Sequence, residues 1–180
     1  MRPANFPPEV KGIGYGIFPS RGGVAVGVIC MQGRINMLEL DCPFHLGDKL
    51  VAELRTKTPV IVVDFHAEAT SEKIAYGWFM DGRVSAVLGT HTHVQTADEQ
   101  VLPGGTAYIT DVGMTGPHDS VIGAEKGAVL QRFLTRMPVR FEPATGDVKL
   151  CGVLIDVDES TGKARHIERL RIDLKEQAGD

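Results

Sequence analysis

Three of the six histidines follow apolar runs at the points where predicted strands end. His66 comes directly after the run 59–65, and His91 and His93 come directly after the run 84–90. The carboxyl ends of parallel strands share one edge of a sheet, where open α/β folds bind ligands, so we expect the three rings to converge. In an extended His-X-His both rings project to the same side. Imidazole is a favoured ligand of zinc, iron, manganese and similar ions, so the pattern predicts a metal site, whereas one such histidine alone would indicate a hydrogen-bonded loop residue.

Carboxylates lie beside these histidines. Asp64 and Glu68 bracket His66, and a metal-bound histidine usually donates its other N–H to a carboxylate or carbonyl. The alternatives are a strand-end turn for Asp64 and a helix-start carboxylate for Glu68. Asp111 ends another predicted strand and reaches the same edge. Three roles are open for it: a ligand, a partner of a ligand, or a turn former. We group these three with Thr92 as residues that support the ligands or contact the substrate.

The other histidines are expected to have structural or surface roles. His45 lies near a helix start, His166 lies in a hairpin, and His118 lies in a loop where we expect it to face solvent. Gly89 precedes the His-Thr-His segment and permits a tight backbone turn where side chains must converge.

The elements that must position these residues form a βαβ unit. The run 59–65 is continuously apolar and rich in β-branched residues, which predicts a strand buried on both faces. A helix over 70–82, with Thr70 or Ser71 as its N-cap, leads to a second strand over 84–90. A strand, a helix and a strand in this order predict parallel pairing. One face of that helix carries three large apolar residues: Ile74, Trp78 and Phe79.

The flanking sequence adds hairpins to this unit, so the expected fold class is α/β. The first twelve residues read as an extended arm without periodicity. The remaining predicted elements are a hairpin around residues 20–23, a helix over 45–57, a strand over 106–110, a helix over 124–136 and a closing hairpin around residues 159–162.

Composition fits one domain over residues 1–180. The chain has 180 residues, 43% of them hydrophobic and 23% charged, and a net charge of −4, which argues against a broad nucleic-acid-binding surface. Its three cysteines, Cys30, Cys42 and Cys151, are widely spaced, which excludes a disulfide framework and a Cys-X-X-Cys zinc site. No apolar run reaches the roughly 18 residues of a membrane span. We therefore expect a cytoplasmic protein.

Longer motifs around the histidines carry a family resemblance. The segments 64–73 (DFHAEATSEK), 89–98 (GTHTHVQTAD) and 109–123 (ITDVGMTGPHDSVIG) closely resemble the YmdB-type bacterial metallophosphoesterases. The segments 2–7 (RPANFP) and 40–44 (LDCPF) are also similar to that family. The likeness runs from the first residues to the closing hairpin, and the three long motifs together are highly specific.

The resemblance implies a calcineurin-like metallophosphoesterase sandwich, with β-sheets flanked by helices. It implies a centre of two divalent ions, iron or manganese, and the hydrolysis of small phosphodiesters such as cyclic nucleotides. Carried over residue by residue, His66 and His91 would bind one ion and His93 the other. Two ions polarise the phosphoryl oxygens and supply a hydroxide nucleophile at neutral pH.

This sequence also departs from the family pattern. Family members begin with a further segment that supplies an Asp, a Glu-Asn pair and an Asn-His pair, including the proton donor, and residues 1–60 contain none of these motifs. The resemblance therefore implies an N-terminally truncated domain, the C-terminal two-thirds of the family's, whose catalytic proton donor is unknown and which binds at most one ion. The alternative is a non-catalytic metal-binding or oligomerisation module. Loss of that segment would expose an apolar sheet edge, which predicts a homo-oligomer.

Overall fold

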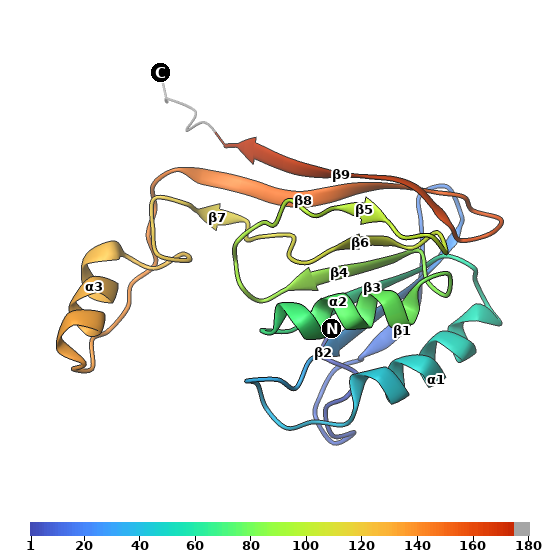
Figure 1. Ribbon diagram of the computed structural model, residues 1–180, viewed down its shortest axis with the longest axis horizontal. Helices are drawn as coiled ribbons and strands as arrows, with labels where there is room; N and C mark the ends of the chain where they lie inside the picture. Colours follow the sequence, from blue (N-terminus) through green and yellow to red (C-terminus); the bar gives the residue numbers. More distant parts are fainter. Residues whose placement is uncertain (175–180) are drawn as a thin grey trace.

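The computed structural model describes residues 1–174, and its elements follow the predicted order (Figure 1). The three helices are α1 (Pro43–Arg55), α2 (Thr70–Met80) and α3 (Lys126–Thr135). The strands are β1 (Tyr15–Pro19), β2 (Ala25–Gln32), β3 (Ile61–His66), β4 (Ala86–Thr90), β5 (Gln100–Val101), β6 (Ala107–Ile109), β7 (Gly116–Pro117), β8 (Val148–Val157) and β9 (Ala164–Asp173). None of the helices in this part of the chain is long and apolar enough to span a membrane.

The central sheet has six strands in the order β1-β2-β3-β4-β6-β5. Strands β2, β3, β4 and β6 are parallel, which confirms the βαβ unit, while β1 and β5 pair antiparallel at the two edges. Along β3, Ile61, Val63 and Phe65 are buried and the residues between them are half-buried, so the predicted burial on both faces is only partly correct. The buried row packs against α1 and α2, which cover the same face of the sheet.

The opposite face of the central sheet packs against a second sheet, β7-β8-β9. Ala86 and Ile109 of the first sheet meet Ile155 and Ile167 of the second in a smaller apolar core. Strands β8 and β9 form the predicted closing hairpin. The two packed sheets, with α1 and α2 on the outer face of the central sheet, confirm the α/β sandwich.

Helix α2 differs from its prediction in two respects. Its N-cap is Ala69, which makes no side-chain cap, and neither Thr70 nor Ser71 takes that place. The face of Ile74, Trp78 and Phe79 is exposed. The buried face instead combines apolar and charged residues: Glu72, Lys73, Tyr76, Gly77 and Met80. The spacing of large apolar residues predicted the wrong buried face, because Glu72 and Lys73 are buried with polar partners. Glu72 accepts hydrogen bonds from the backbone N–H groups of residues 34 and 35.

The N-terminal residues are anchored to β2 and do not form a free arm. The Asn5 side chain is buried, accepts a hydrogen bond from the backbone N–H of Gln32 and donates to the carbonyls of Gln32 and Asp41. The backbone N–H of Ala4 donates to the Cys30 carbonyl. This anchoring fixes the loop that follows β2 at the carboxyl edge of the sheet.

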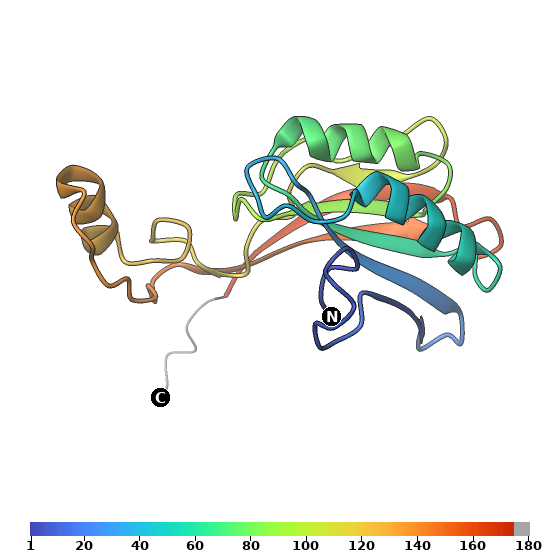
Figure 2. The same cartoon turned by 90° about the horizontal axis from the view of Figure 1, so that it is seen from below.

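Residues 124–143 form a segment that extends away from the two sheets, and we call it the projecting segment (Figures 1 and 2). Backbone hydrogen bonds between residues 123–125 and 142–144 close its base. It contains the predicted helix α3, of which Val129 alone is buried. The helix is therefore present as predicted, but it packs against neither sheet.

Candidate metal centre

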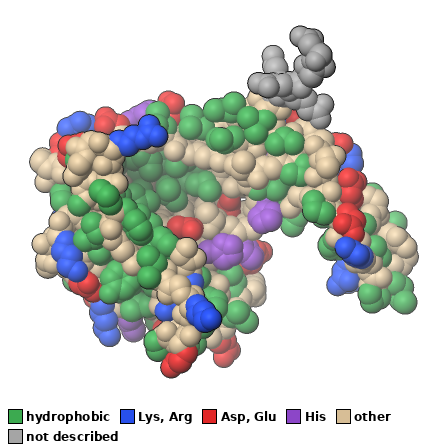
Figure 3. Space-filling model, turned by 180° about the vertical axis from the view of Figure 1, so that it is seen from behind, with side chains coloured by type: hydrophobic (Ala, Val, Ile, Leu, Met, Phe, Trp, Pro, Cys, Tyr) green, Lys and Arg blue, Asp and Glu red, His purple; other side chains and the backbone are tan. Residues whose placement is uncertain are grey.

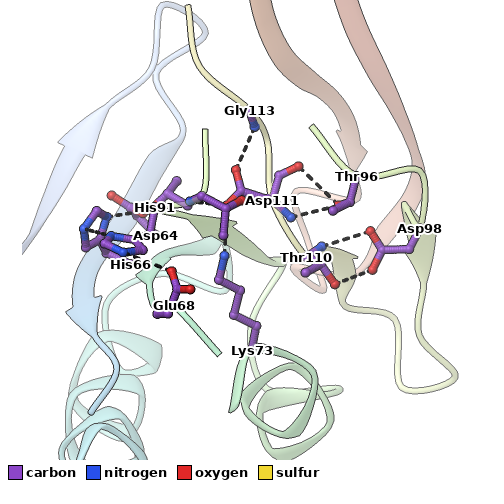
Figure 4. Close-up of polar contacts among 12 residues, drawn as sticks. Asp64, His66, Glu68, Lys73, His91, Thr96, Asp98, Thr110, Asp111 and Gly113 are labelled. Carbon is purple, nitrogen blue, oxygen red and sulfur yellow. Dashed lines mark hydrogen bonds and ion pairs between the residues drawn. The ribbon is translucent and has the colours of Figure 1, made fainter. Parts of the chain in front are cut away.

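His66 and His91 meet at the carboxyl edge of the central sheet (Figure 4). His66 is the last residue of β3 and lies opposite Thr90, the last residue of β4, so His91 begins the loop beside it. The His66 Nε2 and His91 Nδ1 atoms are 3.0 Å apart, and the two rings are nearly perpendicular. The Glu68 Oε2 atom lies 3.2 Å from the His91 Nε2 atom. The structure thus brings together two of the three predicted histidines and one of the predicted carboxylates.

His93 has a different environment. Its Nδ1 atom is 2.9 Å from the carbonyl oxygen of Ile122. Strand β4 ends before the His-Thr-His segment, and the backbone φ angles are 110° at His91 and 67° at His93. The expectation of an extended His-Thr-His is therefore wrong, because two left-handed residues turn the rings in different directions. Within residues 1–174, no three His, Cys, Asp or Glu side chains are grouped so as to hold a metal ion.

A chain of hydrogen bonds fixes the tautomer of His66. The Thr90 hydroxyl donates its hydrogen to Asp64 Oδ1 at 2.9 Å, so it accepts from His66 Nδ1 at 3.2 Å. The hydrogen of a neutral His66 is therefore on Nδ1, and Nε2 presents a lone pair towards His91. Burial lowers the pKa of His66, and the neighbouring His91 acts in the same direction. Both effects favour the neutral ring, which is the form that binds metals.

The orientation of His91 places a second lone pair opposite the first. A carboxylate accepts only, so Glu68 takes a hydrogen from His91 Nε2 and leaves Nδ1 of the neutral ring unprotonated. Two lone pairs 3.0 Å apart repel unless one nitrogen carries a proton or both nitrogens bind one metal cation. A divalent cation that bound both nitrogens would remove this repulsion, and neutral imidazole nitrogens are common ligands of such ions. The residues present therefore fit one divalent ion held by His66 and His91.

Asp111 supports the histidine loop and is not available as a ligand. Its Oδ2 atom accepts hydrogen bonds from Lys73 Nζ at 2.9 Å and from the Thr92 backbone and hydroxyl at 3.0 and 2.7 Å (Figure 4). Its Oδ1 atom accepts from the Gly113 N–H at 2.9 Å. Burial raises the pKa of Asp111, but hydrogen bonds from Lys73, Thr92 and Gly113 outweigh burial and hold it below its usual range. The Lys73–Asp111 pair thus anchors Thr92, the residue between His91 and His93 in the sequence.

A model of the YmdB-like protein family matches residues 1–170 of this chain. The chain belongs to the YmdB-like family. It is 54% identical over 172 residues to a 2',3'-cyclic-nucleotide 2'-phosphodiesterase of Bacillus subtilis, a match that covers 96% of this chain and 65% of the relative.

Two solved structures share the fold of this YmdB-like chain. A crystal structure of a hypothetical protein from Thermus thermophilus matches with a TM-score of 0.89 and 42% identity, over 96% of this chain and 66% of that one. A novel phosphatase from Mycoplasma pneumoniae matches with a TM-score of 0.86 and 36% identity, over 96% of this chain and 63% of that one. The chain therefore spans slightly less than two thirds of the length of these relatives.

The remaining sequence predictions for this YmdB-like chain have mixed outcomes. His45 and His166 are exposed as expected. His118 does not simply face solvent, because it is half-buried and its Nδ1 atom lies 3.0 Å from the Gly116 carbonyl oxygen. Gly89 is required by a close approach, since a Cβ atom there would lie 1.8 Å from the carbonyl oxygen of Thr110. The predicted reason, a tight turn, is wrong.

Sequence reasoning missed two residues that position the site in this YmdB-like chain, Lys73 and Thr90. Lys73 lies on the buried face of α2, where a periodicity analysis expects apolar side chains. Thr90 could have been found from strand register, because the last residues of two adjacent parallel strands lie opposite one another.

Proposed function

We propose that this chain provides a metal-binding half of a phosphodiesterase that hydrolyses small phosphodiesters such as cyclic nucleotides. The observation that carries the proposal is the pair of facing nitrogens, His66 Nε2 and His91 Nδ1, 3.0 Å apart. The activity named for the Bacillus subtilis relative, 2',3'-cyclic-nucleotide 2'-phosphodiesterase, supports the reaction class. The phosphatase from Mycoplasma pneumoniae supports phosphate ester chemistry on this fold.

His66 and His91 would hold one divalent ion, iron or manganese. Such an ion polarises a phosphoryl oxygen and lowers the pKa of bound water towards neutrality. Glu68 keeps Nδ1 of His91 directed at the site by accepting the hydrogen of Nε2. Asp64 keeps Nε2 of His66 directed at the site, because it orients the Thr90 hydroxyl that accepts the hydrogen of His66 Nδ1. In the overall reaction water forms a new P–O bond, the ester P–O bond breaks, and one proton of the water ends on the released sugar hydroxyl.

The charge of this site supports one ion in preference to two. Glu68 is the only carboxylate within hydrogen-bond distance of either of the two metal-facing rings in residues 1–174. Two divalent ions about 4 Å apart repel by roughly 16 kcal/mol at an effective dielectric constant of 20. Further carboxylate ligands would be needed to offset that repulsion. We propose that His93 binds a second ion only when such ligands come from a segment like the unmatched third of the relatives.

A non-catalytic metal-binding or oligomerisation module is the second candidate. It is favoured by the exposed apolar side chains of the projecting segment, among them Phe133 and Leu134. In that case one ion or none would bind, and no phosphodiester would be hydrolysed. For either function we propose the cytoplasm as the compartment, because the three cysteines are free thiols, and a homo-oligomer as the assembly.

The test is the release of nucleoside monophosphate from a 2',3'-cyclic nucleotide in the presence of Mn²⁺. We expect slow or undetectable turnover by the 180-residue chain alone, and recovery when the unmatched third of the Bacillus subtilis relative is added as a separate polypeptide. The His91→Ala variant should abolish that recovery, whereas His166→Ala, at an exposed histidine, should not. No turnover in any mixture would contradict the phosphodiesterase proposal, and rapid turnover by the chain alone would contradict the half-site.

A further inference from the structure

A cavity of about 380 Å³ opens beside the metal centre. It begins at His93 and is lined by residues 93–95, by the loop 114–122 and by residues of β8 and β9. Figure 3 shows histidine side chains beside the hollow between the main body and the projecting segment. The cavity therefore adjoins the His-Thr-His loop but lies outside the His66–His91 pair.

Two histidines of this cavity are oriented by backbone carbonyls. The Nδ1 atom of His93 is 2.9 Å from the carbonyl oxygen of Ile122, and that of His118 is 3.0 Å from the carbonyl oxygen of Gly116. A carbonyl only accepts, so each Nδ1 carries the hydrogen and each neutral ring keeps its Nε2 as an acceptor. The Nε2 atom of His118 has Cys151 Sγ at 3.8 Å, which is a weak partner. Both rings thus retain an acceptor that a ligand hydroxyl could use.

Arg171 gives the cavity a positive charge. Strand β9 carries three arginines, and two of them have acidic partners: Arg165 pairs with Asp158, and Arg169 pairs with Glu99. Arg171 lines the cavity and forms no ion pair or side-chain hydrogen bond within residues 1–174, because the neighbouring carboxylate, Asp173, is paired with Lys149. A guanidinium binds phosphate oxygens with two parallel N–H groups, so an anion is the natural partner of this side chain.

The size and the apolar wall limit what the anion can be attached to. Small-molecule sites occupy about 300–1,000 Å³, so this cavity lies at the small end of the range. Val94, Met114 and Ile122 contribute apolar surface to the lining of the cavity. A flat base with one sugar and one phosphate matches this combination, and an oligonucleotide is too large.

We propose that this cavity is the subsite for the nucleoside of a mononucleotide phosphodiester, and this inference rests on the proposed function. Arg171 donates to the phosphate oxygens, the sugar hydroxyls donate to the free Nε2 atoms of His93 and His118, and the base packs against Met114 and its apolar neighbours. Arg171 is then a specificity residue that favours a nucleotide over an uncharged nucleoside. The projecting segment begins directly after the loop 114–122 that lines this cavity.

The test measures binding of adenosine 3'-monophosphate, adenosine and inorganic phosphate to the full chain by calorimetry, without metal. The Arg171→Met variant should bind the nucleotide roughly tenfold or more weakly and adenosine unchanged, because only a charge-assisted hydrogen bond is lost. Arg171→Lys should restore part of the affinity. Met114→Glu should weaken both adenosine and the nucleotide. The control is Arg165→Met, an arginine on the same strand outside the cavity, which should bind like the unsubstituted chain.

Two results would overturn the subsite: equal nucleotide affinity of Arg171→Met and Arg165→Met, or no nucleotide binding by the unsubstituted chain at millimolar concentration. Failure of the proposed function is a separate observation. It would appear as absent Mn²⁺ binding and absent turnover in the assay above, with nucleotide binding still sensitive to Arg171. Conversely, turnover that recovers as expected with nucleotide binding insensitive to Arg171 would leave the phosphodiesterase and reject the subsite.

Discussion

The edge of the central sheet that carries His66 and His91 and the projecting segment are held in place by different kinds of contact. At the edge, side chains from α2, β3, β4 and the loop after β6 are joined by hydrogen bonds, and the Lys73–Asp111 pair is 1% exposed on both sides. In the projecting segment, Lys126 forms a solvent-exposed pair with Asp119 of the preceding loop, and Phe133 and Leu134 are 71% and 83% exposed. The first region depends on long-range contacts, and the second depends on local ones.

Because of this difference, the local sequence pattern predicts the structure of the projecting segment but not the backbone at the edge of the sheet. Helix α3 forms where its local pattern predicts it, yet nothing in that pattern says what its apolar residues contact. The backbone at His91 and His93 has positive φ angles that no local pattern predicts, and Asp111 holds it through Thr92. Strained backbone of this kind persists where surrounding contacts fix it. Substitutions in the two regions should therefore have very different effects.

The largest expected effect comes from Lys73→Met. The substitution leaves the Asp111 carboxylate buried without its cation, which should lower the free energy of unfolding by about 3–5 kcal/mol. Urea denaturation measures the change. The matched control in the projecting segment is Lys126→Met, whose exposed pair should contribute little. Adding Asp111→Asn to Lys73→Met should recover part of the loss. If the Lys73→Met variant were as stable as Lys126→Met, the Lys73–Asp111 pair would not hold this edge together.

The next effect concerns metal affinity. Thr90→Val keeps the side-chain shape but removes the hydroxyl that connects His66 to Asp64. Because His66 then loses the partner that fixes its tautomer, Mn²⁺ should bind roughly 10- to 100-fold more weakly. Calorimetric titration gives the affinity, and Thr135→Val in α3 is the control. Unchanged Mn²⁺ binding in Thr90→Val would mean that His66 is oriented by other contacts.

A smaller effect is expected from acid. The native pKa of Asp111 lies below its usual range, so its contribution to stability is complete above the unfolded value of about 3.9 and is lost as the pH falls through the native pKa. The unfolding midpoint of the unsubstituted chain should therefore fall below about pH 4, and that fall should be shallower in Asp111→Asn. Urea midpoints measured between about pH 3 and pH 6 test this, a range that brackets the unfolded pKa. Identical pH profiles for the two proteins would contradict the assignment of this linkage to Asp111.

The smallest effect on stability is expected in the projecting segment. Leu134→Ser removes an exposed apolar side chain, so the free energy of unfolding should change by less than about 0.5 kcal/mol. The same substitution should shift sedimentation velocity profiles towards the monomer if these side chains mediate self-association. A monodisperse monomer of the unsubstituted chain would reject the proposed oligomer.

The sequence predicted most of the fold because its signals are local. Runs of β-branched residues marked β3 and β4, and helical spacing marked α1 and α3. It also placed His66 and His91 at one edge, because strand ends and parallel pairing follow from the βαβ order. It could not place His93, because the turn of the backbone depends on Asp111 and Lys73, which are distant in sequence. The buried face of α2 was missed because buried charges look like surface residues until their partners are known.

The central claim is that His66 and His91 hold one divalent ion in this chain. Titration with Mn²⁺, followed by electron paramagnetic resonance of the free ion, measures the number of ions bound per chain and the affinity. We predict weak binding of one ion per chain, abolished by His66→Ala and by His91→Ala and retained in His166→Ala. Binding that survives the loss of both His66 and His91, or two tightly bound ions in the 180-residue chain, would contradict it.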